Sequence, residues 1–438
     1  MAKIVFLAVS GVRVANERLA RLGVTLPGFV ERAKVIASMP SLGLLTLAAV
    51  TPDRHALRYI EMGEFDAEAV DALDADLVAI SSFTAKSHVM YAIADRLRAR
   101  GVTVVLGGLH CTLVPQEATA HADAVVAGEG ELAWPQLLAD WERGALRPVY
   151  RSAFRDLDLA GVPVPRYDLL DIDRYNRLPL QTARGCPLDC DFCAASKIFG
   201  GYKRRPVENV VRDLRAIKSL WPRPFIELAD DNTFVHKEWS KELVRAIAEE
   251  NVHWFTETDV SVADDPGLLD LLATSGCRQL LIGFESPNAA SLEGIEAHDW
   301  KLRQFDGYRR VIDDVQERGI TVNGCFIVGL DRDTPAVFEE IERFVETSGL
   351  LEVQVTVLTP FPGTPLFRRL KSEGRLLRDR YWDQCTLFDV TYQPKGMSVT
   401  QLELGLERLM TSLYSADATA SRRRRFGEIA RRLHREAS

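Results

Sequence analysis

The sequence predicts an α/β protein with two successive sets of parallel strands, followed by C-terminal helices. Unbroken apolar runs alternate with stretches of helical periodicity, and glycines or acidic residues end many of the runs. This alternation occurs twice, before and after a connection rich in Pro and Arg at 161–179. Continuous apolar strands separated by helices are typical of a parallel sheet that is covered on both faces. We therefore expect a doubly wound parallel sheet first and a partial (β/α)6 barrel second.

The bulk composition is that of an ordinary globular protein. The 438 residues suffice for two or three domains, and 47% of them are apolar and 26% charged. No run of about 18 apolar residues is present, so we expect no membrane span. The short apolar stretch near the N-terminus precedes polar and charged residues, which favours a first strand over a signal peptide. The net charge of −8 argues against nucleic acid as a partner, and we expect a cytoplasmic protein.

The first third contains the strands and the helix of the first sheet. Apolar runs predict strands at 3–8, 57–61, 76–83, 103–108 and 123–127, and the clearest helix covers 85–100. Glycines follow two of these strands, at Gly107–Gly108 and at Gly128 and Gly130. In open parallel sheets, ligands bind at the carboxyl ends of the strands. The alternative is that these glycines only form tight turns.

The middle of the chain contains a second series of strand–helix repeats. The expected strands are the one that leads into Cys186 and those at 224–232, 253–260, 278–286, 321–330 and 353–361. Helices separate them at 235–250, 266–275, 303–318 and 335–348. This makes about six β/α units, an incomplete relative of the eight-stranded barrel, in which catalytic groups lie at the C-terminal ends of strands.

Three of the seven cysteines, Cys186, Cys190 and Cys193, have the spacing C-x3-C-x2-C. Three thiolates this close suit a [4Fe–4S] cluster and leave its fourth iron without a protein ligand. An open coordination site is what substrate chemistry requires. The alternative is structural zinc, which usually needs a fourth Cys or His nearby, and the next histidine is His236. The scattered Cys277, Cys325 and Cys385 are expected to be core or surface residues.

The cysteine segment resembles the signature of the radical S-adenosylmethionine superfamily, including the aromatic Phe192. The resemblance implies that the open iron binds the amino and carboxylate groups of S-adenosylmethionine. It also implies that an electron from the reduced cluster breaks a carbon–sulfur bond of S-adenosylmethionine, which gives methionine and a 5′-deoxyadenosyl radical. It further implies that Phe192 and the segment 359–366 lie near the adenine. Asp230 and Asp231 would receive the methionine amino group, and Glu285 the ribose hydroxyls.

The N-terminal third resembles the cobalamin-binding-type domain that precedes many radical enzymes. The resemblance rests on the segments 40–52, 107–118 and 126–131 and on the strand end at Ser81–Ser82. It implies that Ser81, Gly107 and Gly108 contact a cofactor.

The chain departs from the pattern D-x-H-x-x-G, which supplies a cobalt-ligating histidine after the first strand. The only D-x-H is Asp53–Arg54–His55, with Arg58 where the glycine would stand. We interpret His55 as a surface residue and His110 as structural. Two readings therefore stay open: the domain binds cobalamin without a histidine ligand, or it serves as a scaffold.

The expected domains are a cobalamin-binding-type domain at 1–145, a linker at 146–178, the radical barrel at 179–366 and a helical region at 367–438. The run Arg422–Arg425 is most simply a solvated helix face, and its alternative role is docking of an acidic electron donor such as flavodoxin.

Two outcomes of the radical chemistry compete. In the first, the radical abstracts hydrogen from a polar metabolite, as in dehydration or deoxygenation of a sugar or aminoglycoside. In the second, cobalamin transfers a methyl group to an unactivated carbon. The missing histidine and the acidic strand ends favour the first, because Glu257 and Asp259 would suit a cationic substrate and act in catalysis. A non-enzymatic alternative is an iron–sulfur or zinc scaffold or sensor.

Overall fold

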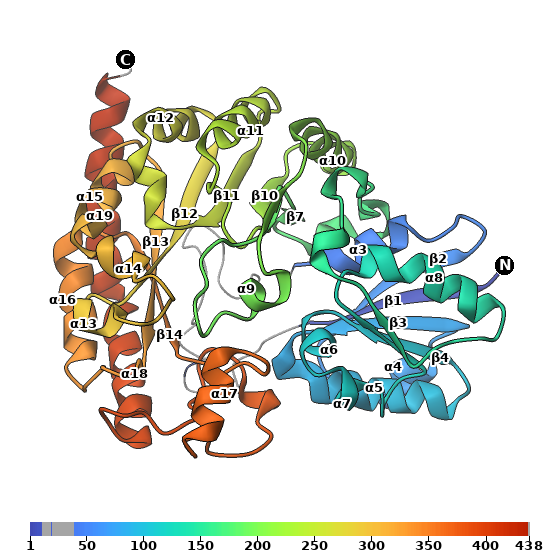
Figure 1. The fold of residues 1–438 in the computed structure, drawn as a ribbon. Coiled ribbons are helices and arrows are strands. Elements are labelled where there is room, and N and C mark those ends of the chain that lie inside the picture. Colours follow the sequence, from blue (N-terminus) through green and yellow to red (C-terminus); the bar gives the residue numbers. More distant parts are fainter. Residues whose placement is uncertain (11–18, 20–38, 437–438) are drawn as a thin grey trace.

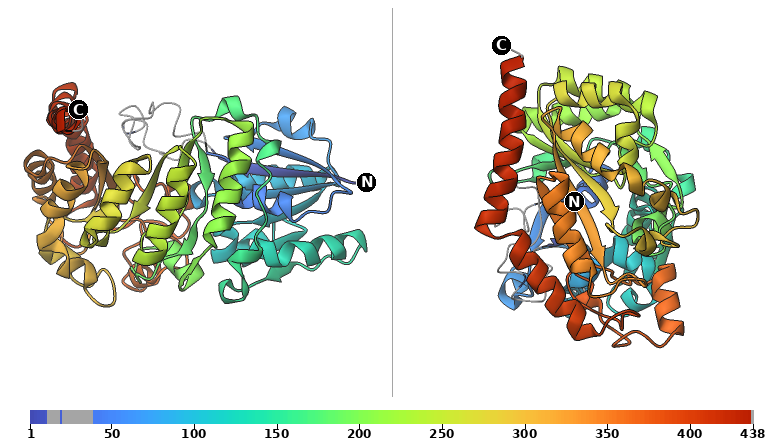
Figure 2. Two further views of the ribbon diagram at one scale, coloured as in Figure 1. Left: turned by 90° about the horizontal axis from the view of Figure 1, so that it is seen from above. Right: turned by 90° about the vertical axis from the view of Figure 1, so that its left-hand side faces the viewer.

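The computed structural model describes residues 1–10, 19 and 39–436, which form two six-stranded parallel sheets and a set of C-terminal helices (Figure 1). The N-terminal sheet has the strand order β2-β1-β3-β4-β5-β6, and the second sheet has the order β14-β13-β12-β11-β10-β7. The two units lie side by side, with the N-terminal strand and the C-terminal helix at opposite ends of the molecule (Figure 2). The expected fold class is confirmed.

The N-terminal sheet is covered by helices on both faces. Alternate residues of β1 (Lys3–Val9) enter two separate apolar cores: Val5 and Leu7 face one, Ile4 and Phe6 the other. The remaining strands are β2 (Ala56–Met62), β3 (Leu77–Ser82), β4 (Thr103–Gly107), β5 (Ala124–Ala127) and β6 (Val149–Arg151). The first core contains residues of α4 (Ala67–Asp71), α5 (Ser87–Ala99), α6 (Leu109–Leu113) and α7 (Pro115–Ala118). The second contains residues of α3 (Leu42–Ala49) and α8 (Gly130–Glu142).

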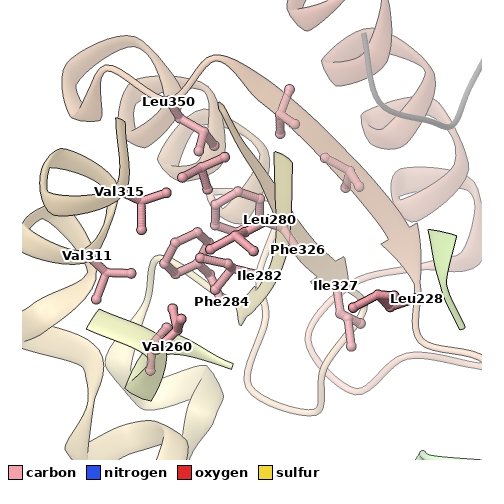
Figure 3. Packing of buried hydrophobic residues seen from close by; sticks show 14 of the residues in the cluster. Leu228, Val260, Leu280, Ile282, Phe284, Val311, Val315, Phe326, Ile327 and Leu350 are labelled. Atoms are coloured by element: carbon pink, nitrogen blue, oxygen red, sulfur yellow. The ribbon is translucent and has the colours of Figure 1, made fainter. Parts of the chain in front are cut away.

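The second sheet forms the partial barrel. Its strands are β7 (Leu178–Leu180), β10 (Phe225–Leu228), β11 (His253–Thr258), β12 (Cys277–Glu285), β13 (Thr321–Val328) and β14 (Glu352–Val357). Its main helices are α10 (Val207–Leu220), α11 (Lys237–Glu249), α12 (Pro266–Thr274), α15 (Tyr308–Gln316) and α16 (Val337–Ser348). On β12, Leu280, Ile282 and Phe284 are fully buried in the core, where Val311 and Val315 of α15 also lie (Figure 3). The intervening residues face the barrel interior, because side chains alternate along a strand.

Two local differences from the sequence-based expectation occur. The strand expected to lead into Cys186 is β7, which ends at Leu180, and the chain then leaves the sheet. The next segment, β8 (Ala183–Gly185), pairs instead with β9 (Tyr202–Arg204) as an antiparallel hairpin that encloses the cysteines and α9 (Ala194–Phe199). The edge strand β6 was not expected, because its three residues are too few to show a periodic pattern.

The C-terminal region consists of α17 (Pro365–Ser372), α18 (Val399–Leu413) and α19 (Ala416–Glu436). The run Arg422–Arg425 lies on α19, along the outer side of the barrel (Figure 2). The expectation of a solvated face is wrong for Arg422, which is buried because its guanidinium donates to the carbonyls of Leu351 and Leu413. Among the described residues, no helix is both long and apolar enough to cross a membrane.

The corner between β7 and β8 is held by one buried carboxylate. Asp230, just after β10, accepts hydrogen bonds from the backbone N–H groups of Thr182 at 2.8 Å and Ala183 at 2.9 Å, both on Oδ1. Its Oδ2 accepts from the hydroxyls of Thr182 and Thr233. These N–H groups have left the sheet ladder, so the carboxylate replaces the strand that would otherwise accept from them.

Replacing Asp230 by Ala should therefore destabilise the protein. Two buried N–H groups would lose their acceptor, and we expect the free energy of unfolding to fall by about 2–4 kcal/mol, as measured by denaturant or thermal unfolding. Asp230→Asn should cost less, since its amide oxygen can still accept from both N–H groups. Glu403→Ala, on the exposed face of α18, is the control. An Asp230→Ala variant as stable as this control would contradict the assigned role.

Candidate active site

The three cysteines of the C-x3-C-x2-C segment lie around one cavity in the barrel. The cavity measures about 420 Å³ and lies at the carboxyl ends of the barrel strands, where barrel enzymes place their catalytic groups. Cys190 is buried, whereas Cys186 and Cys193 are half-buried, and all three are free thiols. Of the other residues predicted for this site, the cavity is lined by Phe192, Asp231, Glu257, Asp259 and Glu285.

The cysteine loop has the features of a cluster site with one open corner. The three thiols face the same cavity, and the Asn232 side-chain amide donates to the Cys186 sulfur at 3.8 Å. Burial raises the pKa of the Cys190 thiol to about 12, so a positively charged ligand is needed to keep it as a thiolate. Within the described residues, no three His, Cys, Asp or Glu side chains converge closely enough for a single metal ion. The donor set fits a [4Fe–4S] cluster, which the three cysteines would hold with one iron left without a protein ligand.

The adjacent carboxylates Asp230 and Asp231 point to different places. Asp231 lines the cavity, and its Oδ2 accepts from the Gly185 N–H at 2.9 Å. Both oxygens of Asp230 are engaged by the β7–β8 corner and it does not line the cavity, which argues against its predicted cofactor role.

Glu285 ends β12 inside the cavity and forms an ion pair with Lys301, with 2.6 Å between Oε1 and Nζ. Asp259 also lines the cavity, but its oxygens accept from the Asn232 amide at 2.7 Å and from the Ser261 N–H at 2.8 Å. Glu257 lies on the inner face of β11. Much of the acidic charge expected from the sequence therefore has partners within the protein.

A second cavity of about 340 Å³ lies between the two units, at the carboxyl ends of the N-terminal strands. The predicted cofactor residues Ser81, Gly107 and Gly108 all line it. Gly108 has φ +88°, and a Cβ there would lie 2.4 Å from the Ser81 hydroxyl oxygen. The glycine thus keeps this strand end open. The barrel contributes Gln181, Arg184 and other residues to the opposite wall.

Neither N-terminal histidine of interest faces this second cavity. His110 is fully buried, its Nε2 lies 3.0 Å from the Tyr91 hydroxyl, and burial lowers its pKa to about 4. The structural interpretation of His110 is supported. The interpretation of His55 as a surface residue is wrong: it is 8% exposed, packs near Trp141 and lies 3.2 Å from a Glu142 oxygen.

Three residues of the two cavities were not expected from the sequence. Lys301 lies on the four-residue helix α14, which is too short to show a periodic pattern, and Cys325 lines the cluster cavity although the sequence predicts only a core or surface residue there. Arg184 lies in the inter-domain cavity and donates to Glu129 and Glu131 of the N-terminal unit. Of these three residues, only Arg184 has a signal in the sequence, because it lies two residues before Cys186.

A three-cysteine loop at the strand ends of a partial barrel, beside a doubly wound domain, defines a class of iron–sulfur enzymes with an appended cofactor domain. Residues 180–345 match the Radical SAM superfamily, and residues 30–138 match the B12 binding domain. The chain therefore contains a Radical SAM domain that follows a domain of the B12-binding type. A Radical SAM domain implies a [4Fe–4S] cluster and S-adenosylmethionine. Residues 364–437 match a domain of unknown function, DUF4070.

Curated relatives span most of the chain. Bacteriochlorophyllide d C-12(1)-methyltransferase of Chlorobaculum tepidum is 27% identical over 88% of this chain and 84% of its own length. Hopanoid C-2 methylase of Rhodopseudomonas palustris is 28% identical over 79% of this chain and 67% of its own length.

Solved structures share the two-domain fold. The radical S-adenosylmethionine methyltransferase TsrM from Kitasatospora setae, solved with cobalamin and a [4Fe–4S] cluster, has a TM-score of 0.68 at 16% identity. The match covers 87% of this chain and 76% of TsrM. The cobalamin-dependent radical enzyme OxsB also scores 0.68, at 14% identity, over 93% of this chain and 66% of OxsB.

Replacing Cys186, Cys190 and Cys193 together by Ala should abolish the cluster. After anaerobic reconstitution, the parent chain should hold about four iron and four sulfide per protein, because the three thiolates are its ligands. The triple variant should hold little of either by chemical assay. Cys385→Ala is the matched control, since this buried cysteine lies outside the cavity. A full iron and sulfide content in the triple variant would refute the site.

Proposed function

We propose that this chain is a cobalamin-dependent radical S-adenosylmethionine methyltransferase that acts on carbon. The observation that supports it best is the adjacency of the two cavities. Arg184 lines the inter-domain cavity and Cys186, two residues on, lines the cluster cavity. A methyl carrier bound in the first would therefore lie directly beside the cluster and the substrate.

One glycine makes this arrangement possible. Gly185 has φ +86°, and a Cβ there would lie 2.0 Å from the Gly201 carbonyl oxygen. The left-handed conformation redirects the chain between Arg184 and Cys186. The segment from Arg184 to Cys186 thereby contributes one lining residue to each cavity.

The proposed division of labour follows the expected domains: a cobalamin-binding unit at 1–145, a linker at 146–178, a radical barrel at 179–366 and a helical region at 367–438. The bound groups would supply reductive cleavage of S-adenosylmethionine and a methyl carrier. The chain's own residues hold and orient them: Cys186, Cys190 and Cys193 bind iron, and Asp231 and Asn232 line the open side. Ser81, Gly107 and Gly108 provide the floor of the carrier site.

No histidine among the described residues lines the inter-domain cavity. The proposal therefore requires cobalamin to bind without a histidine ligand, which is the first of the two readings left open by the sequence. The methyltransferase names of the relatives favour methyl transfer, whereas no comparison supports dehydration or deoxygenation. An electron donor such as flavodoxin stays a prediction, as do catalytic roles for Glu257 and Asp259.

The substrate is proposed to be a small molecule that enters the barrel cavity. Apolar side chains from β12, β13, β14, the loop after β14 and the segment between α17 and α18 form much of its wall: Leu281, Ile327, Val357, Leu358, Phe361 and Leu387. A cationic substrate stays a prediction. The structure supports it less than the sequence does, because Asp259 accepts a hydrogen bond from Asn232 and Glu285 pairs with Lys301.

Protein produced with cobalamin available should contain about one equivalent of cobalt by metal assay. Gly108→Val should lower this content severalfold, because a side chain at Gly108 collides with Ser81 and is strained at positive φ. Gly161→Ala is the control, since its Cβ meets nothing within 4 Å and its φ is ordinary. Absence of cobalt from the parent chain, with the cluster fully assembled, would refute methyl transfer through cobalamin.

A further inference from the structure

The loop after β12 brings a buried cation into the cluster cavity. The chain passes from Glu285 through α13 (Ala289–Leu292) to α14 (Trp300–Arg303), which carries Lys301. On the way, Glu296 forms a β-bridge with Cys190, and the Asp191 N–H donates to the Ile295 carbonyl at 3.0 Å. The loop is therefore fastened directly to the cysteine segment.

The turn that positions Lys301 is itself fixed by a carboxylate. The Glu296 side chain accepts from the His298 N–H at 2.9 Å and from the Trp300 N–H. Glu296 thus joins the cluster loop through its backbone and the start of α14 through its side chain. The position of Lys301 relative to Cys190 follows from these contacts.

Lys301 is the single cationic side chain among the described residues that line the cavity. The same wall carries four cysteines, the three of the loop and Cys325, and the four carboxylates of Asp231, Glu257, Asp259 and Glu285. Lys301 and Glu285 are both almost fully buried, with side chains 7% and 11% exposed, and form the 2.6 Å ion pair. Water screens charges only weakly at this buried position, and of the two partners Lys301 acts on Cys190 more strongly than Glu285 does.

The backbone around Glu285 is shaped to admit this pair. Glu285 has φ +64°, which is uncommon for a residue with a side chain, and the pairing with β13 shifts register between Gly283 and Glu285. A Cβ at Gly283 would lie 2.6 Å from the Glu285 carboxylate and 3.5 Å from the Lys301 ammonium. Strain of this kind persists where the surrounding structure fixes a functional group.

We propose that Lys301 is the counter-charge of the cluster and favours its reduced form. Reduction adds a negative charge to a cluster that three thiolates already surround, and net charge and nearby groups set the potential of such clusters. The 2.6 Å contact with the Glu285 carboxylate favours the charged ammonium of Lys301 over the neutral amine. This inference rests on the cluster of the proposed function and not on methyl transfer.

The test is a redox titration of the reconstituted cluster, followed by electron paramagnetic resonance. Lys301→Met should keep the iron and sulfide content but disfavour reduction about tenfold, a fall of roughly 59 mV for one electron. Glu285→Gln should raise the potential, since it removes a neighbouring negative charge. The double variant should return close to the parent value. Lys371→Met, exposed on α17, is the matched control and should change nothing.

An unchanged potential in Lys301→Met with a full cluster would overturn the proposal. If Lys301→Met fails to hold iron, two other variants test the proposal. It requires the potential of Lys301→Arg to match that of the parent and the potential of Glu285→Gln to be higher. A parent chain without any cluster would instead refute the proposed function.

Discussion

The structure of both cavities depends on two consecutive carboxylates at the end of β10. Asp230 accepts from the backbone of residues 182 and 183, and Asp231 accepts from the N–H of Gly185. This segment has left the sheet, so the two carboxylates accept the backbone hydrogen bonds that a neighbouring strand would otherwise accept. Because the cysteine segment begins directly afterwards, the position of Cys186 is set by the barrel and not by a free loop.

The same segment ties the barrel to the N-terminal unit. The Arg184 side chain is 12% exposed and pairs with Glu129 and Glu131, which lie at the start of α8 and are 4% and 11% exposed. Removing one partner from a buried ion pair leaves an uncompensated charge, which is strongly unfavourable. The contact therefore favours one arrangement of the two units. In that arrangement Arg184 lines the inter-domain cavity, and Cys186, two residues on, lines the cluster cavity.

The fold and the cysteine site could be predicted from the sequence because both have strong local signals. Apolar runs located most strands, and C-x3-C-x2-C located the three cysteines that line one cavity. The roles of Asp230 and Asp231 could not be separated, since a strand end gives no periodicity and the direction of each side chain follows the local backbone. Lys301 lies 16 residues after Glu285 in an irregular loop, so nothing local connects the two. His55 was misread because polarity alone does not reveal that Trp141 and Glu142 of a distant helix cover it.

Several carboxylates of the barrel cavity have hydrogen-bond or ion-pair partners within the protein, and this affects which molecules the cavity can select. Counted along the sequence, the strand ends carry a surplus of carboxylates, and such a surplus attracts cations. In the folded protein, Asp259 caps the turn that begins at Val260, and the Lys301 ammonium offsets Glu285. A charge already offset by a buried neighbour contributes little to the field that an entering molecule meets, whereas apolar walls act by excluding water from it. The aliphatic wall around Leu281 and Ile327 is therefore as much a determinant of what binds as the acidic residues are.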